Sequence, residues 1–177
     1  MKKIALMMTL VAGSSAAQDT LFDKGVKFGG FGGPAAKYYN IEGEDLFVVG
    51  GKGGLLFGSE RHEFTFGGAG YSGATSFDSQ YSFAGLLLGY AYNTDAVVHP
   101  ELELAIGSAY IYTELNEDEE VGEFGQFVDL TLSAEVNLLS FLRSGVGIGY
   151  HHSNIDAFNS SNPSGWHLGV DFEFGGM

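Results

Sequence analysis

The sequence contains no cysteine, which excludes disulfide bonds, a thiol nucleophile, cysteine-ligated metals and lipid attachment through a cysteine. Basic residues are also scarce, because 8 Lys and Arg stand against 22 Asp and Glu, for a formal net charge of −14. A chain this acidic is a poor ligand for nucleic acid, whose phosphates require basic side chains. We therefore expect no nucleic-acid partner and consider basic partners or divalent cations instead.

The chain also lacks an apolar run long enough for a transmembrane helix, which needs roughly 20 residues. A shorter apolar run, residues 4–11, follows Lys2 and Lys3 and precedes small residues at positions 15–17. This order is typical of a secretory signal peptide cleaved before Gln18, with a buried N-terminal helix as the alternative. We expect residues 1–17 to be a cleaved signal peptide and residues 18–177 to form one exported domain.

Proline is rare, at 3 residues, whereas glycine and aromatic residues are abundant, with 28 Gly, 15 Phe and 9 Tyr. Apolar and polar side chains alternate with period two in segments of about ten residues, which indicates strands with two different faces. We identify eight such segments: 25–33, 46–57, 61–71, 80–92, 98–113, 124–138, 141–152 and 165–175. The sequence therefore predicts an all-β protein, an eight-stranded antiparallel up-and-down barrel.

A soluble β-sandwich or lipocalin also alternates, but three features favour a transmembrane barrel. The connections alternate between longer polar segments (34–45, 72–79, 114–123 and 153–164) and short links, as in outer-membrane barrels. Tyr, Phe and Trp collect near the strand ends, where interfacial girdles form. The expected signal peptide requires export. We therefore expect both termini in the periplasm and four long extracellular loops.

The last segment fits the C-terminal insertion signal of outer-membrane barrels, with His167, Gly169, Phe172 and Phe174 at its defining positions and three further residues after Phe174. The chain resembles, over about residues 25–174, the small outer-membrane barrel superfamily, OmpA/OmpX-like in size, and within it uncharacterised glycine-rich barrels. The resemblance rests also on the glycine-rich stretches 49–54 and 145–150. It implies a barrel fold and a location in the Gram-negative cell envelope. We expect a monomer, with outer-membrane lipids and the barrel-assembly machinery as partners and an extracellular ligand at the loops.

If the apolar faces meet lipid, the charged side chains of the opposite faces point into the lumen. These residues are Lys27, Lys52, Glu63, Glu101, Glu103, Asp129, Glu135, Arg143, His151, Asp171 and Glu173. An eight-stranded barrel is just wide enough for its side chains to fill, so they are expected to form a hydrogen-bonded polar plug. A narrow cation-preferring channel is the alternative, because acidic residues outnumber basic ones in this set.

The sequence His151-His152-Ser153-Asn154 matches the His-x-Ser-Asn motif of the lipid A 3-O-deacylase family, which are also eight-stranded barrels. This resemblance implies His151 as base, Ser153 as nucleophile and Asn154 as oxyanion donor. The chain departs from the family because no Glu follows between Asn154 and Trp166. The alternation also places His151 and Ser153 on the lumen side, whereas a deacylase needs its nucleophile facing lipid.

Four adjacent carboxylates, Glu117, Asp118, Glu119 and Glu120, are the candidate calcium ligands, although they lack the spacing of an EF-hand loop and fit a solvated loop. We expect no cofactor and no metal-spaced histidine pair. The sequence thus favours a non-enzymatic outer-membrane barrel with a structural, adhesion or surface-interaction role through its loops. A lipid A-modifying deacylase is the second hypothesis and a cation channel the third.

Overall fold

The computed structural model describes residues 25–41, 44–59, 61–75, 79–116, 119–155 and 163–176. These residues form eight strands: β1 (Lys27–Ile41), β2 (Glu44–Gly58), β3 (His62–Thr75), β4 (Ser79–Tyr92), β5 (Val98–Asn116), β6 (Glu119–Leu139), β7 (Leu142–Ser153) and β8 (Gly165–Gly176). Within these described ranges, no helix is long and apolar enough to cross a membrane. The expected signal peptide, residues 1–17, lies outside the described residues.

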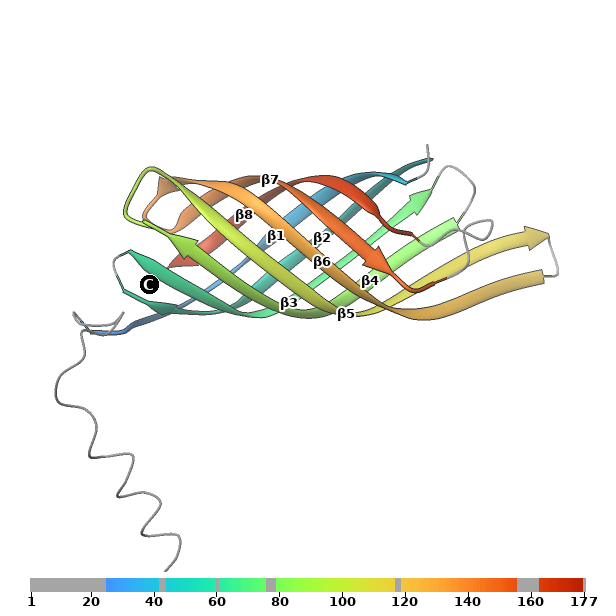
Figure 1. The fold of residues 1–177 in the computed structure, drawn as a ribbon, viewed down its shortest axis with the longest axis horizontal. Helices are drawn as coiled ribbons and strands as arrows, with labels where there is room; N and C mark the ends of the chain where they lie inside the picture. Colours follow the sequence, from blue (N-terminus) through green and yellow to red (C-terminus); the bar gives the residue numbers. More distant parts are fainter. Residues whose placement is uncertain are drawn as a thin grey trace, which may run out of the picture.

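The eight strands form one closed barrel in which each strand pairs antiparallel with the next in sequence (Figure 1). The barrel closes where β1 pairs with β8, from Tyr39 opposite His167 to Gly30 opposite Gly176. The predicted eight-stranded up-and-down barrel is therefore confirmed. We call the end with the connections after β1, β3, β5 and β7 the loop end, and the opposite end, where the described chain starts and stops, the turn end.

The outer surface of the barrel is apolar and the interior is polar. In β6, Leu130 and Leu132 are about half exposed, whereas the alternating residues Asp129, Thr131 and Glu135 are buried inside. Large apolar side chains are likewise exposed on other strands, among them Phe47, Val49, Leu55, Leu102, Ile106, Val146, Ile148, Leu168 and Val170. A soluble barrel has the reverse distribution, so this fold is a transmembrane β-barrel.

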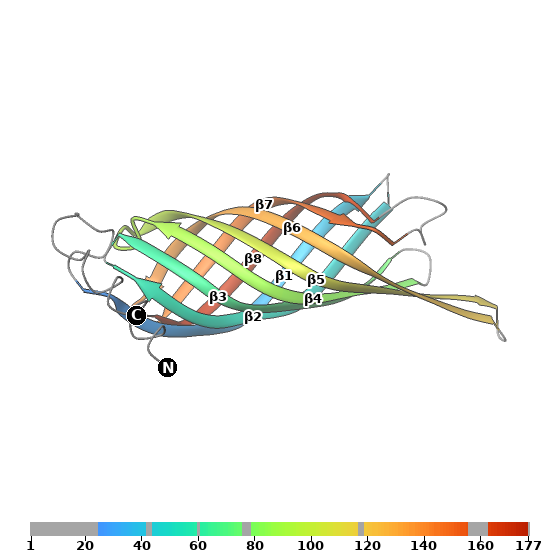
Figure 2. The ribbon, with the colours of Figure 1, turned by 60° about the horizontal axis from the view of Figure 1, so that its bottom comes forward.

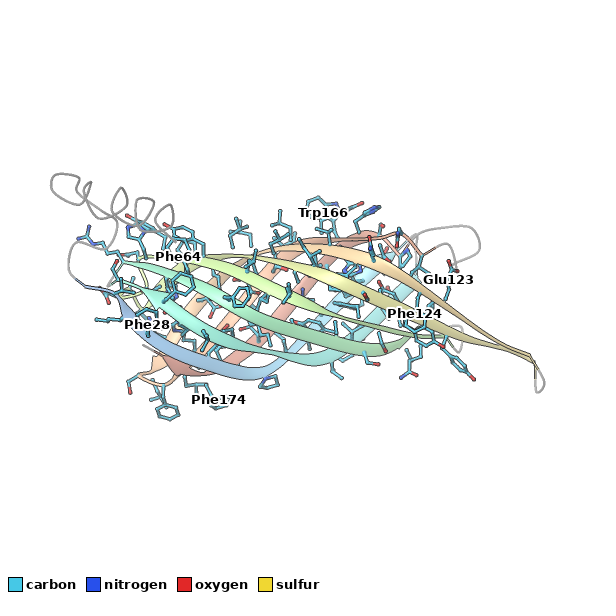
Figure 3. All side chains as sticks on the ribbon, turned by 90° about the horizontal axis from the view of Figure 1, so that it is seen from below. Phe28, Phe64, Glu123, Phe124, Trp166 and Phe174 are labelled. Carbon is cyan, nitrogen blue, oxygen red and sulfur yellow. The ribbon has the colours of Figure 1, made fainter. Side chains whose placement is uncertain are left out.

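Aromatic side chains mark both edges of the apolar band. Figure 3 shows Phe28, Phe64 and Phe174 toward the turn end, and Phe124 and Trp166 toward the loop end. Phe28, Phe124 and Trp166 are among the most exposed apolar side chains of the described residues. This arrangement matches the two interfacial girdles of transmembrane barrels.

The strands are longer at the loop end than the alternation predicts. β1 continues to Ile41, so residues 34–41 belong to a strand, and much of 72–79 and 114–123 is also paired. Three of the four long connections predicted at this end are shorter than expected, and only the one between Ser153 and Gly165 keeps about the predicted length. Outside the apolar band neither face needs to be apolar, so the alternation stops while the backbone ladder continues.

The β5–β6 hairpin is the longest feature of the barrel. β5 has 19 residues and β6 has 21, whereas the other strands have 12 to 15. Their pairing continues from Val98 opposite Val136 to Asn116 opposite Glu119. Figures 1 and 2 show this hairpin, in yellow and gold, extending past the other strands at the loop end.

Candidate functional site: the polar interior of the barrel

The lumen toward the loop end is organised around Asp129 of β6. Its Oδ1 accepts hydrogen bonds from Lys37 Nζ at 2.7 Å and Thr131 Oγ1 at 3.0 Å. Its Oδ2 lies 3.1 Å from His151 Nδ1 and 3.2 Å from His167 Nε2. Asp129 is 2% exposed and both histidine side chains are fully buried. This one buried carboxylate therefore has polar partners on three other strands, β1, β7 and β8, as well as Thr131 on its own strand, as a buried charged group requires.

Aromatic side chains surround this polar centre. The ring of His151 stacks on Phe127 with centroids 5.3 Å apart and tilts against Phe83 at 4.8 Å. Tyr39 lies edge-on to His151, and the Tyr81 hydroxyl is 2.9 Å from His151 Nε2. Together these rings fill the lumen toward the loop end, where an eight-stranded barrel has room for little more than its own side chains.

The His151-to-Asn154 motif divides between the two faces of the barrel. His151 and Ser153 are fully buried in the lumen, as the alternation predicts. Asn154 is exposed, where its side-chain oxygen accepts a hydrogen bond from Gln126 N at 2.6 Å and its own N donates to Gln126 O at 3.1 Å. The three residues therefore do not share a site, and neither His151 nor Ser153 faces lipid.

The lumen toward the turn end holds a second cluster, in which one ammonium group faces several carboxylates. Lys52 Nζ lies 2.9 Å from Glu103, 2.9 Å from Glu173, 3.5 Å from Asp171 and 4.0 Å from Glu101. The Lys52 side chain is only 2% exposed. We call Lys52 with Glu101, Glu103, Glu135, Asp171 and Glu173 the carboxylate cluster.

A separate ion pair lies below the carboxylate cluster at the turn end. Arg143 of β7 donates hydrogen bonds to Glu63 of β3 through both terminal nitrogens of its guanidinium, with the Nη2–Oε2 contact at 3.0 Å. A polar hollow of about 410 Å³ opens beside this pair and is lined also by Lys27, Asp95 and Asn137. Lys27 is exposed at the rim, so it faces the mouth of the barrel without entering the packed interior.

The structure places the remaining sequence-predicted residues as follows. Glu63, Glu101, Glu103 and Glu135 are buried in the lumen, and Asp171 and Glu173 line it from β8. In the insertion segment His167 faces the lumen, while Phe172 and Phe174 are about half exposed on the lipid side. Glu117 and Asp118 lie outside the described residues; Glu119 and Glu120 are the first residues of β6.

The sequence pattern does not predict the position of Lys37 in this interior. The first strand expected from the alternation ends at residue 33, which leaves Lys37 in a loop, whereas it lies in β1 with its ammonium on Asp129. The signal is present, because Ala35, Lys37 and Tyr39 share one face of β1 and all three are buried. Pro34 obscures it by suggesting that the strand has ended.

No protein-family model and no curated protein matches the chain. Among solved structures, Neisserial surface protein A (NspA) superimposes with a TM-score of 0.57 and 12% identity, covering 85% of this chain and 99% of that one. The N-terminal β-barrel domain of Pseudomonas aeruginosa OprF gives 0.54 and 10%, covering 84% and 96%. Ail, the attachment invasion locus protein of Yersinia pestis, gives 0.51 and 11%, covering 83% and 97%. At these identities the likeness establishes the fold, which is that of the small outer-membrane barrels.

Proposed function

We propose that this protein is an outer-membrane barrel with a non-enzymatic role in surface attachment, carried by the β5–β6 hairpin at the loop end. The observation that carries the proposal is the length of that hairpin, which extends beyond the rim on an otherwise short-stranded barrel. Loops and hairpins on a rigid scaffold are where binding residues concentrate. We place the loop end outside the cell, so that both termini lie in the periplasm and the hairpin projects from the cell surface. Ail, which shares this fold, is named for attachment and invasion.

The charge of the loop end indicates what kind of partner the hairpin would meet. Residues 40–47, 73–80, 111–126 and 152–165 contain eleven Asp and Glu but no Lys or Arg. Six of these acidic residues lie between positions 114 and 123, in and around the hairpin tip. A surface with charges of one sign selects partners of the opposite sign and accelerates their association. The partner we propose is therefore a basic protein surface.

The filled lumen supports a surface role over transport. Side chains that cross the barrel interior, from Lys37 to Asp129 and from Arg143 to Glu63, connect strands on different sides of the lumen. The aromatic rings around His151 occupy the space between them. An open pore would require these contacts to separate, and buried ion pairs are costly to break.

Shortening the hairpin tests this proposal. Tyr112 and Gly122 are register partners, so residues 113–121 can be replaced by an Asn-Gly turn without disturbing the barrel below. We expect cells expressing the shortened protein to lose most of the adherence to cultured cell monolayers that the full chain confers. The folded barrel is verified by its mobility on unheated gels, and surface display by an epitope tag in the 156–162 connection.

A matched pair of charge variants tests the proposed partner. Glu117→Gln with Asp118→Asn removes two charges from the segment that joins β5 to β6, and Glu60→Gln with Asp95→Asn removes two from the segments that join β2 to β3 and β4 to β5. We expect only the first pair to weaken binding of the purified barrel to an immobilised lysine-rich polypeptide, and added salt to weaken it further. Equal binding by both pairs, or undiminished adherence after hairpin shortening, would contradict the proposal.

A further inference from the structure

Three glutamates of the carboxylate cluster converge in the lumen from three different strands. Glu101 of β5, Glu135 of β6 and Glu173 of β8 each present a carboxylate oxygen, and these three oxygens lie within 4.8 Å of one another. All three residues are at most 5% exposed. We propose that they bind one hard divalent cation of the calcium class inside the barrel.

Unpartnered oxygens distinguish this group from an ordinary ion-pair network. Both oxygens of Glu135 are buried with no hydrogen-bond partner, and so is Oε2 of Glu101. Lys52 does not hydrogen-bond them, because its ammonium makes its short contacts with Glu103 and Glu173, both at 2.9 Å, and lies 4.0 Å from Glu101 Oε2. Buried carboxylates without partners are costly, so this group needs either protons or a cation.

Glycine provides the space that these carboxylates occupy. Gly145 of β7 lies directly between Glu135 of β6 and Asp171 of β8 in the strand register. A Cβ at this position would lie 2.1 Å from Glu135 Oε1 and 2.7 Å from Asp171 Oδ2. Any side chain at position 145 would therefore displace the Glu135 carboxylate from the cluster.

The donor set indicates the class of ion. The three ligands are carboxylate oxygens, which suit hard cations such as calcium and magnesium and not soft metals. Their oxygens lie within 4.8 Å of one another, close enough to contact one cation at calcium–oxygen distances of about 2.3–2.6 Å. Calcium tolerates irregular ligand geometry, whereas magnesium demands a near-ideal octahedron and keeps several of its waters, so a fixed, buried set of three carboxylates favours calcium. The polar hollow at the turn end brings solvent close to the cluster, as far as the Arg143–Glu63 pair.

Calcium binding to the purified full chain, folded in detergent and freed of metal by a chelator, tests the site. We expect about one calcium per chain by equilibrium dialysis, with a Kd in or below the roughly millimolar range of extracellular calcium modules. Glu135→Gln, which keeps the side-chain size, should weaken binding at least about tenfold. The matched control neutralises the hairpin carboxylates (Glu117→Gln, Asp118→Asn, Glu119→Gln and Glu120→Gln) and should keep the bound ion.

Three results would overturn the assignment. The first is a folded wild-type barrel that binds no calcium at about 5 mM, above the roughly millimolar range of extracellular sites. The second is loss of the ion in the hairpin control but not in Glu135→Gln, which would move the site to the hairpin. The third is tighter binding of zinc than of calcium. If Glu135→Gln does not fold, as judged on unheated gels, Glu101→Gln replaces it, and the wild-type measurement is unaffected. The outcome is independent of the attachment role.

Discussion

Replacing Lys52 by methionine measures how strongly the carboxylate cluster depends on its only ammonium group among the described residues. Methionine keeps the length and apolar stem of lysine, so the substitution removes the charge with little change in packing. It leaves Glu103 and Glu173, each 2.9 Å from the ammonium, without their cation. Asp171 at 3.5 Å and Glu101 at 4.0 Å also lose an opposite charge.

The expected loss of stability follows from the geometry of these contacts. At an effective dielectric constant of 20, Coulomb's law gives about 6 kcal/mol of attraction for each of the two contacts at 2.9 Å. Desolvation of the buried ammonium offsets a large part of this attraction. Removing one partner of a buried pair typically costs about 3–5 kcal/mol. Because Lys52 serves two carboxylates at once, we expect the upper part of that range.

Unfolding in urea, with the protein inserted in lipid vesicles, provides the assay. The sequence has one tryptophan, Trp166, and its side chain is 65% exposed on the outer surface of the barrel. Its fluorescence therefore reports insertion into lipid without interference from other tryptophans. Gel mobility of unheated samples gives an independent measure of the folded fraction.

Lys27→Met is the matched control, because it removes the same charge from the exposed rim. A surface substitution of this kind should change the free energy of unfolding by no more than about 0.5 kcal/mol. A Lys52→Met variant whose free energy of unfolding falls by less than about 1 kcal/mol, or by no more than that of the control, would refute the reasoning. In that case the carboxylates would be neutralised by some means other than Lys52.

Two further pairs of substitutions test the lumen face and the lipid face of the barrel by the same unfolding assay. Gly149→Ala should destabilise the barrel by about 1–3 kcal/mol, because a Cβ there would lie 2.4 Å from His167 Nε2. Gly169→Ala, where the nearest atom is 3.6 Å away, should change little, and equal losses would contradict the argument. Leu132→Arg on the lipid face should lower the free energy of unfolding by about 2–4 kcal/mol, whereas Phe28→Arg near the rim should lower it by only about 0–1 kcal/mol. Equal costs for these two arginines would count against a membrane around the apolar band.

The fold is predictable because the side-chain period of a strand is local information. Val128, Leu130 and Leu132 alternate with Asp129 and Thr131 in the sequence, and the structure exposes the first set and buries the second. In a closed barrel each residue faces either lipid or lumen, so an alternating segment specifies its own orientation. The same alternation is sufficient to place His151 on the lumen side, where the structure buries it.

Strand length is not predictable, because the alternation reports the surroundings of the side chains and not the backbone pairing. Asn40 and Asp45 are paired in the β1–β2 ladder although both are polar and exposed. Beyond the apolar band the outer face does not meet lipid, so polar side chains there carry no penalty in free energy. No pattern of side chains therefore marks where the backbone pairing ends. The length of the β5–β6 hairpin, on which the attachment proposal rests, is therefore a result of the structure.

The sequence by itself determined which face of each alternating segment points into the lumen, whereas the tertiary structure alone decided how far the strands continue and which lumen side chains meet. Lys52 of β2 contacts Glu103, 51 positions away, and Glu173 of β8, and nothing near Lys52 in the sequence indicates either partner. Such contacts depend on strand tilt and stagger, which are set by closure of the whole barrel. The convergence of Glu101, Glu135 and Glu173 has the same origin. Three separate strands each contribute a carboxylate to one point because the closed ladder fixes their relative heights.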